Sequence, residues 1–287
     1  MSEYIKYKGT LFPQLSTTLK DLNFLENEFL IRDDDIFNIT YPKSGTTWVT
    51  EILSIIHTNG DPTWCNTVPN WDRIPWLESP DVAEKLQENQ SQQRLITSHL
   101  AKHLFCKSFF GSKAKVIYTA RNPKDVLVSL YYFAKMSVFY EDPESFDALF
   151  KQFITGKLPY GSWFDHVRGW MEMTGKDNFF FNTYEDLQRD LRGSVIRISK
   201  FLGKSFDDAV IDSIVENVTF NTMKKNNMAN FTMLSSTYMD QEKSPFLRKG
   251  VTGDWKNHFT VAQSEYFDQV YKEKMQDLCV KFPWDNN

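Results

Sequence analysis

The chain has 287 residues, of which 41% are hydrophobic and 24% charged, and its 33 Lys and Arg against 37 Asp and Glu give a net charge of −4. This balance excludes a protein that binds nucleic acid through an overall basic charge, although it allows a local basic site. No apolar run approaches the roughly 20 residues of a membrane-spanning helix, and Met1–Lys6 lacks the apolar core of a signal peptide. Three scattered cysteines (Cys65, Cys106 and Cys279) are too few for a disulfide framework. We therefore expect a soluble, cytoplasmic globular protein that binds neither nucleic acid nor membranes.

Short β-branched runs alternate with helical patterns along the chain. Four runs predict strands, at Ile36–Thr40, Arg94–Ser98, Lys115–Thr119 and Asn178–Thr183. Periodicity and capping residues predict helices at Thr47–His57, from Asn122 through Leu130, at Glu185–Leu191, at Ser194–Leu202 and at Val261–Asp277. This alternation predicts an α/β fold, with a single domain over residues 1–287 and a central parallel sheet flanked by helices. Residues 228–250 show neither period, which is typical of a mobile lid over a site.

The segment between the first predicted strand and its helix is rich in groups that bind anions. It reads Tyr41-Pro42-Lys43-Ser44-Gly45-Thr46-Thr47-Trp48. A loop there directs free backbone N–H groups and the positive end of the helix dipole at a ligand, and Lys43 adds a full charge. The order differs from the Walker A loop, in which the lysine follows the second glycine and precedes a magnesium-binding hydroxyl. The sequence therefore predicts a P-loop-like phosphate cradle that works without a metal.

A second anion site is indicated further along the chain. Arg121 follows the strand Lys115–Thr119, and the carboxyl ends of parallel strands are where α/β sheets bind ligands. Ser129 on the next helix and the cluster Arg248-Lys249-Gly250 add further donors. Two separated anion sites suit a nucleotide that is phosphorylated at two places.

Several motifs together resemble the cytosolic sulfotransferases, and most closely their hydroxysteroid and bile-acid branch. They are Tyr41–Thr46, Arg121-Asn122-Pro123-Lys124-Asp125, Tyr160-Gly161-Ser162-Trp163, Tyr184-Glu185-Asp186, Arg248–Lys256, Thr97-Ser98-His99-Leu100 and the Phe282-Pro283-Trp284 ending. The resemblance implies transfer of a sulfuryl group from 3′-phosphoadenosine 5′-phosphosulfate (PAPS) to the hydroxyl of a hydrophobic small molecule, without a metal.

The resemblance also assigns expected roles to residues. His99 is the expected general base, since a neutral imidazole can take a proton from an alcohol. Lys43 is expected to stabilise the leaving group, with Ser129 restraining it. The expected donor-binding residues are Lys43, Ser44, Gly45, Thr46, Thr47 and Trp48 around the phosphosulfate, Arg121, Ser129, Arg248, Lys249 and Gly250 at the 3′-phosphate, and Tyr184 and Met223 at the adenine. Val218 departs from the family, which usually has a hydroxyl residue there.

The composition indicates where an acceptor would bind. Aromatic residues make up 15% of the chain, which suits either a Phe-rich core or an apolar cavity. The expected cavity residues are Phe12, Pro13, Trp71, Trp76, Tyr132, Phe133, Phe139 and Tyr238. The family's dimerisation pattern is matched by Lys256, Thr260, Val261 and Glu265, which predicts a homodimer.

Other functions remain open at this point. One alternative is a sulfotransferase for phenols or other foreign alcohols. A kinase that holds ATP on the Lys43 loop would need Mg²⁺, and the sequence lacks both the Walker order and an Asp at the neighbouring strand end. A non-catalytic sterol- or nucleotide-binding protein would need none of Lys43, His99 and Ser129.

Overall fold

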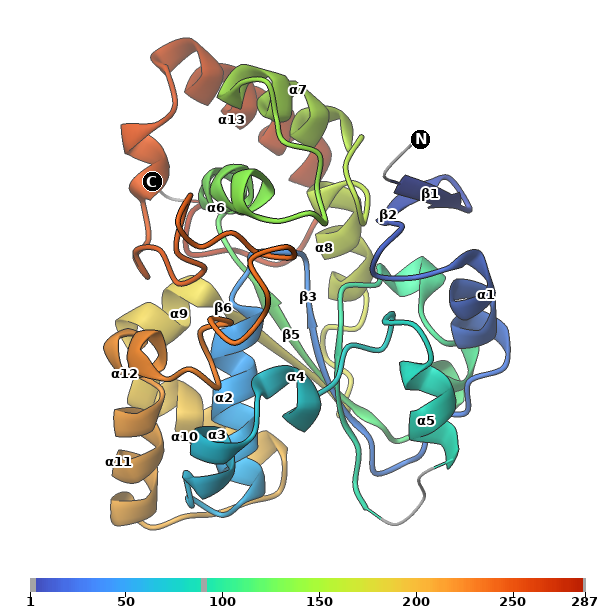
Figure 1. Ribbon diagram of the computed structural model, residues 1–287, viewed down its shortest axis with the longest axis vertical. Coiled ribbons are helices and arrows are strands. Elements are labelled where there is room, and N and C mark those ends of the chain that lie inside the picture. The colour runs from blue at the N-terminus through green and yellow to red at the C-terminus, as the bar shows by residue number, and fades with distance from the viewer. Residues whose placement is uncertain (1–3, 89–91, 286–287) are drawn as a thin grey trace.

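The computed structural model describes residues 4–88 and 92–285, and a four-stranded parallel sheet lies at its centre (Figure 1). The strands are β3 (Ile36–Thr40), β4 (Leu95–Ser98), β5 (Lys115–Ala120) and β6 (Phe179–Thr183), in the order β4-β3-β5-β6. The predicted strands and the α/β class are thus confirmed, each strand end within one residue. Residues 1–3, 89–91 and 286–287 lie outside the described residues. Two predictions extend over some of them, namely the single domain of residues 1–287 and the lack of a signal-peptide core in Met1–Lys6.

Helices connect and cover the strands. They are α1 (Leu19–Asn27), α2 (Thr46–His57), α3 (Thr63–Thr67), α4 (Asn70–Arg73), α5 (Val82–Glu88), α6 (Pro123–Met136), α7 (Phe146–Thr155), α8 (Trp163–Met171), α9 (Tyr184–Arg189), α10 (Leu191–Phe201), α11 (Asp208–Asn217), α12 (Phe220–Lys225) and α13 (Val261–Met275). Short 3₁₀ turns form at Lys102–Leu104, Lys107–Gly111 and Asp254–Asn257, and β1 (Tyr4–Tyr7) pairs with β2 (Thr10–Pro13) as an antiparallel hairpin.

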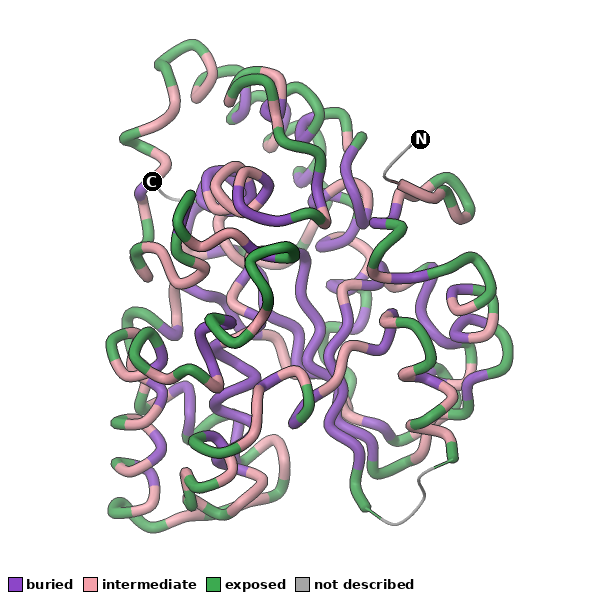
Figure 2. Tube along the Cα trace, viewed as in Figure 1, coloured by how far each residue is buried: buried purple, intermediate pink, exposed green. Residues whose placement is uncertain are grey.

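Side chains that alternate along the strands build a separate core on each face of the sheet. On β5, Val116 and Tyr118 join the core formed with α1, α6, α7, α8 and α13, whereas Ile117 joins the core formed with α2, α9, α10 and α11. This alternation follows from the two-residue period of a strand. The buried trace runs through the sheet and the inner sides of the helices, while the exposed residues follow the outside (Figure 2).

The segment 228–250 contains no helix or strand, as predicted. Its main chain is nevertheless attached to the rest of the fold. The amide of Asn70 donates to the carbonyl of Met228 (2.9 Å), and the amide of Val138 donates to the carbonyl of Tyr238 (3.1 Å). That the segment moves as a lid stays a prediction.

None of the helices in the described residues combines the length and the apolar character needed to cross a membrane.

Candidate active site

The loop after β3 turns sharply before α2 begins. Lys43 and Gly45 both have left-handed backbones, with φ of 68° and 106°, and Gly45 precedes the first residue of α2. A Cβ on Gly45 would lie only 3.0 Å from Cδ2 of Tyr184, so a side chain there would meet both backbone strain and a tight contact. Hydroxyl contacts close the loop, with 2.6 Å between Oγ1 of Thr40 and Oγ1 of Thr46. The loop therefore presents the N-terminus of α2 to the space above the sheet.

His99 lies directly after β4, beside this loop. Its Nδ1 is 2.6 Å from the carbonyl oxygen of Thr40. A carbonyl can only accept, so Nδ1 carries the proton and Nε2 is left as the basic nitrogen. Burial lowers the pKa of His99 to about 3, so the imidazole is neutral at physiological pH. The ring lies between Trp76 and Tyr160, with centroid separations of 4.6 and 5.2 Å.

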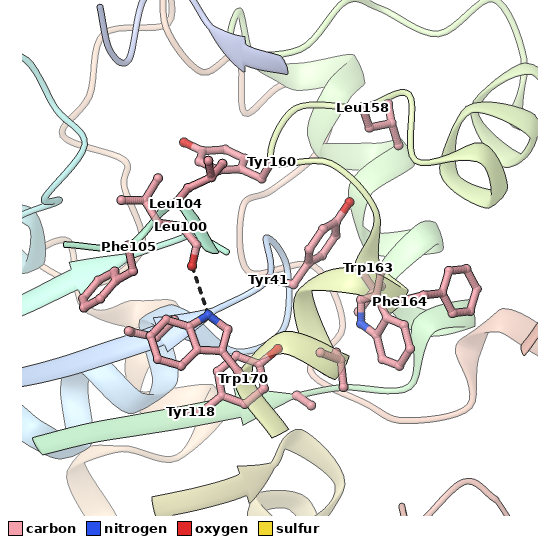
Figure 3. Packing of buried hydrophobic residues seen from close by; sticks show 14 of the residues in the cluster. Tyr41, Leu100, Leu104, Phe105, Tyr118, Leu158, Tyr160, Trp163, Phe164 and Trp170 are labelled. Carbon is pink, nitrogen blue, oxygen red and sulfur yellow. Dashed lines mark hydrogen bonds between the residues drawn. The ribbon is translucent and has the colours of Figure 1, made fainter. Parts of the chain in front are cut away.

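Buried side chains that the sequence analysis did not single out hold the backbone of His99. Oε1 of Glu78 accepts from the amide of His99 (2.5 Å) and from Oγ of Ser98 (2.9 Å). On the other side, Nε2 of His166 lies 3.1 Å from the carbonyl of His99. Figure 3 shows Nε1 of Trp170 donating to the carbonyl of Leu100, at 3.0 Å. Because these bonds run through the main chain, no local sequence pattern signals them.

Lys43 reaches into the same space without a carboxylate partner among the described residues. Its Nζ lies 4.1 Å from the ring centroid of Phe133 and 4.3 Å from that of Phe246. Burial, together with the charge of Arg121, lowers the pKa of Lys43 to about 7. Ser129, one turn before Phe133 on α6, faces the same cavity, but Lys43 rests on the two rings rather than on the Ser129 hydroxyl. The restraining role of Ser129 stays a prediction.

Arg121 bridges the two predicted anion sites. Its Nη1 donates to the carbonyl of Lys43 (3.2 Å) and its Nη2 to that of Val251 (3.1 Å). The guanidinium also stacks on the ring of Tyr184, 4.2 Å from its centroid. Its Nε is buried without a partner among the described residues. Arg121 thus ties the loop after β3 to the segment that carries the second cationic cluster.

That second cluster is organised by one carboxylate. Asp254 accepts from Nη2 of Arg248 (2.6 Å) and from Nζ of Lys249 (2.7 Å). The turn that carries Asp254 is anchored in turn by Asp125 at the start of α6, whose oxygens accept from the amides of Gly253 and Trp255 (2.6 and 2.9 Å). Arg248, Lys249 and Gly250 all line the cavity described below.

Aromatic side chains flank the gap between these two anion sites. The ring centroids of Trp48 and Tyr184 are 5.3 Å apart, and Met223 lines the same wall. Nε1 of Trp48 donates to the backbone carbonyl of Val218 (2.8 Å). Because Trp48 contacts the main chain of residue 218, this hydrogen bond does not depend on a side-chain hydroxyl, which Val218 lacks.

One cavity of about 410 Å³ joins His99 and the two predicted anion sites. It brings together most of the predicted site residues, namely Lys43, Gly45, Thr46, Thr47, Trp48, His99, Arg121, Ser129, Tyr184, Met223, Arg248, Lys249 and Gly250, together with Pro13, Trp71, Trp76, Phe133 and Phe139. Ser44 is buried beside it with an unpartnered hydroxyl oxygen.

Three predicted cavity residues lie outside its lining. Phe12 is fully buried in the core and packs edge-on against Tyr160. Tyr132 on α6 packs against Arg248 and His258. Tyr238 is 49% exposed and stacks on Phe139 from outside.

The lining also includes residues that the sequence analysis did not propose. Among them are Glu78, Tyr140, Tyr160, Phe231, Met239 and Phe246. Phe231, Met239 and Phe246 belong to the segment 228–250. The prediction that this segment covers a site is the sequence signal that could have located them. No three His, Cys, Asp or Glu side chains in residues 4–88 and 92–285 gather in a way that could hold a metal ion.

Comparison with known proteins shows to which family the chain belongs. The model of the sulfotransferase domain matches residues 33–279. The chain belongs to the sulfotransferase family. Sulfotransferase 2B1 of Rattus norvegicus is 50% identical to it over 285 residues, which cover 99% of this chain and 83% of the relative. The 3-beta-hydroxysteroid sulfotransferase of Cavia porcellus is 47% identical over 280 residues, covering 97% of each chain.

A solved structure supports the same sulfotransferase assignment. Mouse sulfotransferase SULT7A1 complexed with PAP superposes with a TM-score of 0.80 at 31% identity, over 96% of each chain.

Proposed function

We propose that this sulfotransferase moves the sulfuryl group of PAPS to a hydroxyl of a hydrophobic small molecule, a hydroxysteroid or a bile acid. The observation that carries the proposal is the placement of His99. Its protonated Nδ1 is fixed on Thr40, and its basic Nε2 has no hydrogen-bond partner in the described part of the chain, at the end of β4 and beside the Lys43 loop that follows the adjacent β3. The names of the relatives favour a steroid acceptor.

The residues of the cavity fit a donor with anionic groups at both ends. The hydroxyl of Ser44 and Nε of Arg121 are buried without partners among the described residues, and Lys43 lacks a carboxylate, so these groups have capacity for an anion. The other end of the donor would meet Arg248 and Lys249, with Trp48, Tyr184 and Met223 beside the adenine. When bound, PAPS supplies an activated sulfuryl group attached to a bisphosphate that can leave.

The chain's own residues then have distinct tasks. His99 Nε2 takes the proton of the acceptor hydroxyl, a step that typically contributes about 10²–10⁴ in rate. Lys43 supplies positive charge at the end of the loop, and a bound anion would raise its pKa again and keep the ammonium charged. The aromatic walls at Trp76, Phe133 and Phe139 bury the apolar body of the acceptor.

The test is an incubation of the purified protein with radiolabelled PAPS, without added metal, against a panel of hydroxysteroids, bile acids, phenols and simple alcohols. We expect the label to move to a hydroxysteroid or a bile acid. Transfer to phenols alone would support the phenol-type sulfotransferase instead. Tight binding of adenosine 3′,5′-bisphosphate without transfer to any alcohol would favour a non-catalytic binding protein.

A further inference from the structure

Among the described residues that line the cavity, Glu78 is the only one with a carboxyl group. It is 2% exposed and forms no salt bridge within the described part of the chain. Two other buried carboxylates differ in this respect, since Glu51 is paired with Arg73 and Asp35 with Arg94. A buried carboxylate without a counter-ion costs free energy. The position of Glu78 therefore suggests that its charge has a partner at another stage of the reaction.

Glu78 reaches His99 because the segment before it runs alongside β4. Trp76 pairs with Thr97 in a parallel bridge, and the amide of Leu77 donates to the carbonyl of Thr97 (2.8 Å). Two residues beyond this bridge, the two segments arrive at Glu78 and His99. Oε1 of Glu78 then accepts from the amide of His99. This pairing thus holds the carboxylate at the main chain of the residue whose imidazole is the proposed base.

Hydrogen bonding alone does not account for a carboxylate at this position. Oε1 accepts from the amide of His99 (2.5 Å) and from Oγ of Ser98 (2.9 Å), and the side-chain oxygen of a glutamine could accept from both. Oε2 has no partner in the described part of the chain. Burial raises the pKa of Glu78 to about 7, so the carboxylate and the carboxylic acid coexist near neutral pH. The negative charge is therefore available to a cation that the resting protein does not supply.

Sulfuryl transfer creates such a cation. When the acceptor oxygen bonds to sulfur, its O–H bond breaks and the proton passes to Nε2 of His99, while the electron pair of the broken S–O bond stays with the departing bisphosphate. The neutral imidazole thereby becomes an imidazolium. Burial and the charge of Lys43 both disfavour this form, as the low pKa of His99 shows. Glu78 is the carboxylate of the cavity that can offset the new charge.

We propose that Glu78 is a positioning residue that acts through His99, with its carboxylate compensating the positive charge that the imidazole gains during sulfuryl transfer. The inference rests on the proposed function, in which His99 is the base. No bond forms or breaks at Glu78. Its oxygen holds the amide of His99 in either protonation state, but only the carboxylate supports the transfer of the proton.

The proposal fixes the direction of the pH dependence. Because the pKa of Glu78 is about 7, its ionised fraction increases with pH through the neutral range. The imidazolium is stabilised only by the ionised form, so kcat should rise between about pH 6 and pH 8 and then level off. This rise is the kinetic signature of the carboxylate.

The other titratable groups packed around the carboxylate and the imidazole do not produce this rise. Burial lowers the pKa values of His99 and His166 to about 3, so both rings are neutral throughout the range. Burial raises the pKa values of Tyr160 and Cys106, which therefore stay protonated. Lys43 has a pKa of about 7, and its deprotonation would lower kcat as the pH rises.

Glu78→Gln isolates the charge, because it keeps an oxygen that accepts from the amide of His99 and from Oγ of Ser98. With PAPS and a neutral hydroxysteroid at saturation, we expect kcat at pH 8 to fall by about tenfold or more and its rise with pH to flatten. KM for the acceptor and the affinity for adenosine 3′,5′-bisphosphate should stay within about twofold of the wild type. Equal kcat in the two proteins, or the same relative rise with pH in both, would overturn the inference.

Ser98→Ala is the matched control, because it removes a hydrogen bond to Glu78 and keeps the charge. The bond from Oγ of Ser98 lowers the pKa of Glu78, so its loss should move the rise in kcat to higher pH without abolishing it. A rise that stays at the same pH in this variant would contradict its assignment to Glu78.

An infrared titration of the protein without donor tests the same carboxyl group directly. In the wild type, the C=O band of the protonated Glu78 should disappear as the pH rises through about 7. Burial also raises the pKa of Glu185 to about 7, and subtracting the titration of Glu78→Gln removes that second band. A difference spectrum without such a band would overturn this inference alone. A wild type that transfers no label from radiolabelled PAPS at any pH would overturn the proposed function and this inference with it.

Discussion

At the scale of single residues, main-chain and buried side-chain groups set the protonation and the position of His99. The carbonyl of Thr40 fixes which ring nitrogen is protonated, and Glu78 and His166 fix the peptide groups on either side. Nδ1 of His166 is itself 2.9 Å from the hydroxyl of Tyr118. His99 in the cavity lining and the buried His166 are thus both held neutral, and this has a consequence for stability.

The stability of the protein should fall as the pH falls, in part because of His166. Burial lowers the pKa of His166 to about 3, below the value near 6.5 of an unfolded chain. Between these values the unfolded state binds more protons, so the free energy of unfolding decreases with decreasing pH, by up to about 1.4 kcal/mol per pH unit for one group. Glu78 acts in the opposite direction, since its raised pKa favours the folded state at low pH.

A comparison of one variant with the wild type isolates the contribution of His166 to the pH dependence of stability. His166→Gln removes the titrating group, so the free energy of unfolding from urea titrations at pH 6.5, 5.5 and 4.5 should depend less steeply on pH than in the wild type. An unchanged slope in the variant would show that His166 does not titrate as its burial implies.

At the scale of elements, all four parallel strands deliver site residues at the same edge of the sheet. β3 leads to Lys43, β4 to His99, β5 to Arg121 and β6 to Tyr184. These strands could be predicted because each is a short, largely apolar run bounded by polar residues. Other elements, such as α7 and the hairpin of β1 and β2, were not predicted.

The loop between β3 and α2 should tolerate no side chain at its glycine. In Gly45→Ala the methyl group would meet Tyr184 at 3.0 Å, in addition to the strain of φ 106°. We expect the affinity for adenosine 3′,5′-bisphosphate, measured by calorimetry, to fall by about tenfold or more. Gly175→Ala is the matched control, because φ is 86° there and the added methyl group meets nothing within 4 Å. Equal affinities in the two variants would contradict the steric argument.

The hydrogen bonds from Asp125 on α6 to the turn that carries Asp254 should affect the binding of the 3′-phosphate only. Asp125→Asn replaces an oxygen that accepts from Gly253 or Trp255 with an amide that cannot accept, which loosens the turn that carries Asp254. A lost buried bond of this kind costs about 1–3 kcal/mol, which corresponds to about fivefold to 150-fold in affinity. Affinity should fall for adenosine 3′,5′-bisphosphate and stay the same for adenosine 5′-monophosphate. A similar loss for both nucleotides would argue against a role at the 3′-phosphate.

At the scale of the whole molecule, the sequence located the cavity but only part of its aromatic lining, since Phe12, Tyr132 and Tyr238 lie outside it. Phe133 lines the cavity, whereas Tyr132, the preceding residue on α6, packs against Arg248 and His258 and is not part of the lining. Successive residues of a helix point about 100° apart, and the rotation of α6 about its axis is set by packing that no local pattern reports. The cavity residues Lys43, His99, Arg121 and Tyr184 were easier to predict, because they lie just after the ends of β3, β4, β5 and β6.

The predicted dimer surface lies on the outside of the fold. Lys256, Thr260, Val261 and Glu265 are exposed, and Val261 is 75% exposed despite being apolar. If this surface forms a homodimer, light scattering after size exclusion should give twice the chain mass of 33.7 kDa, and Val261→Glu should give the single chain mass. A monomeric wild type, or a Val261→Glu variant that stays dimeric, would place the interface elsewhere or exclude it.

The most direct measurement is a single-turnover assay in which excess protein is loaded with radiolabelled PAPS and mixed with a neutral hydroxysteroid. We predict that the wild type transfers the label and that His99→Ala transfers it at least about 10² times more slowly, while both bind adenosine 3′,5′-bisphosphate equally. Near-wild-type transfer by His99→Ala would contradict the assignment of the base, and a wild type that transfers no label would contradict the account as a whole.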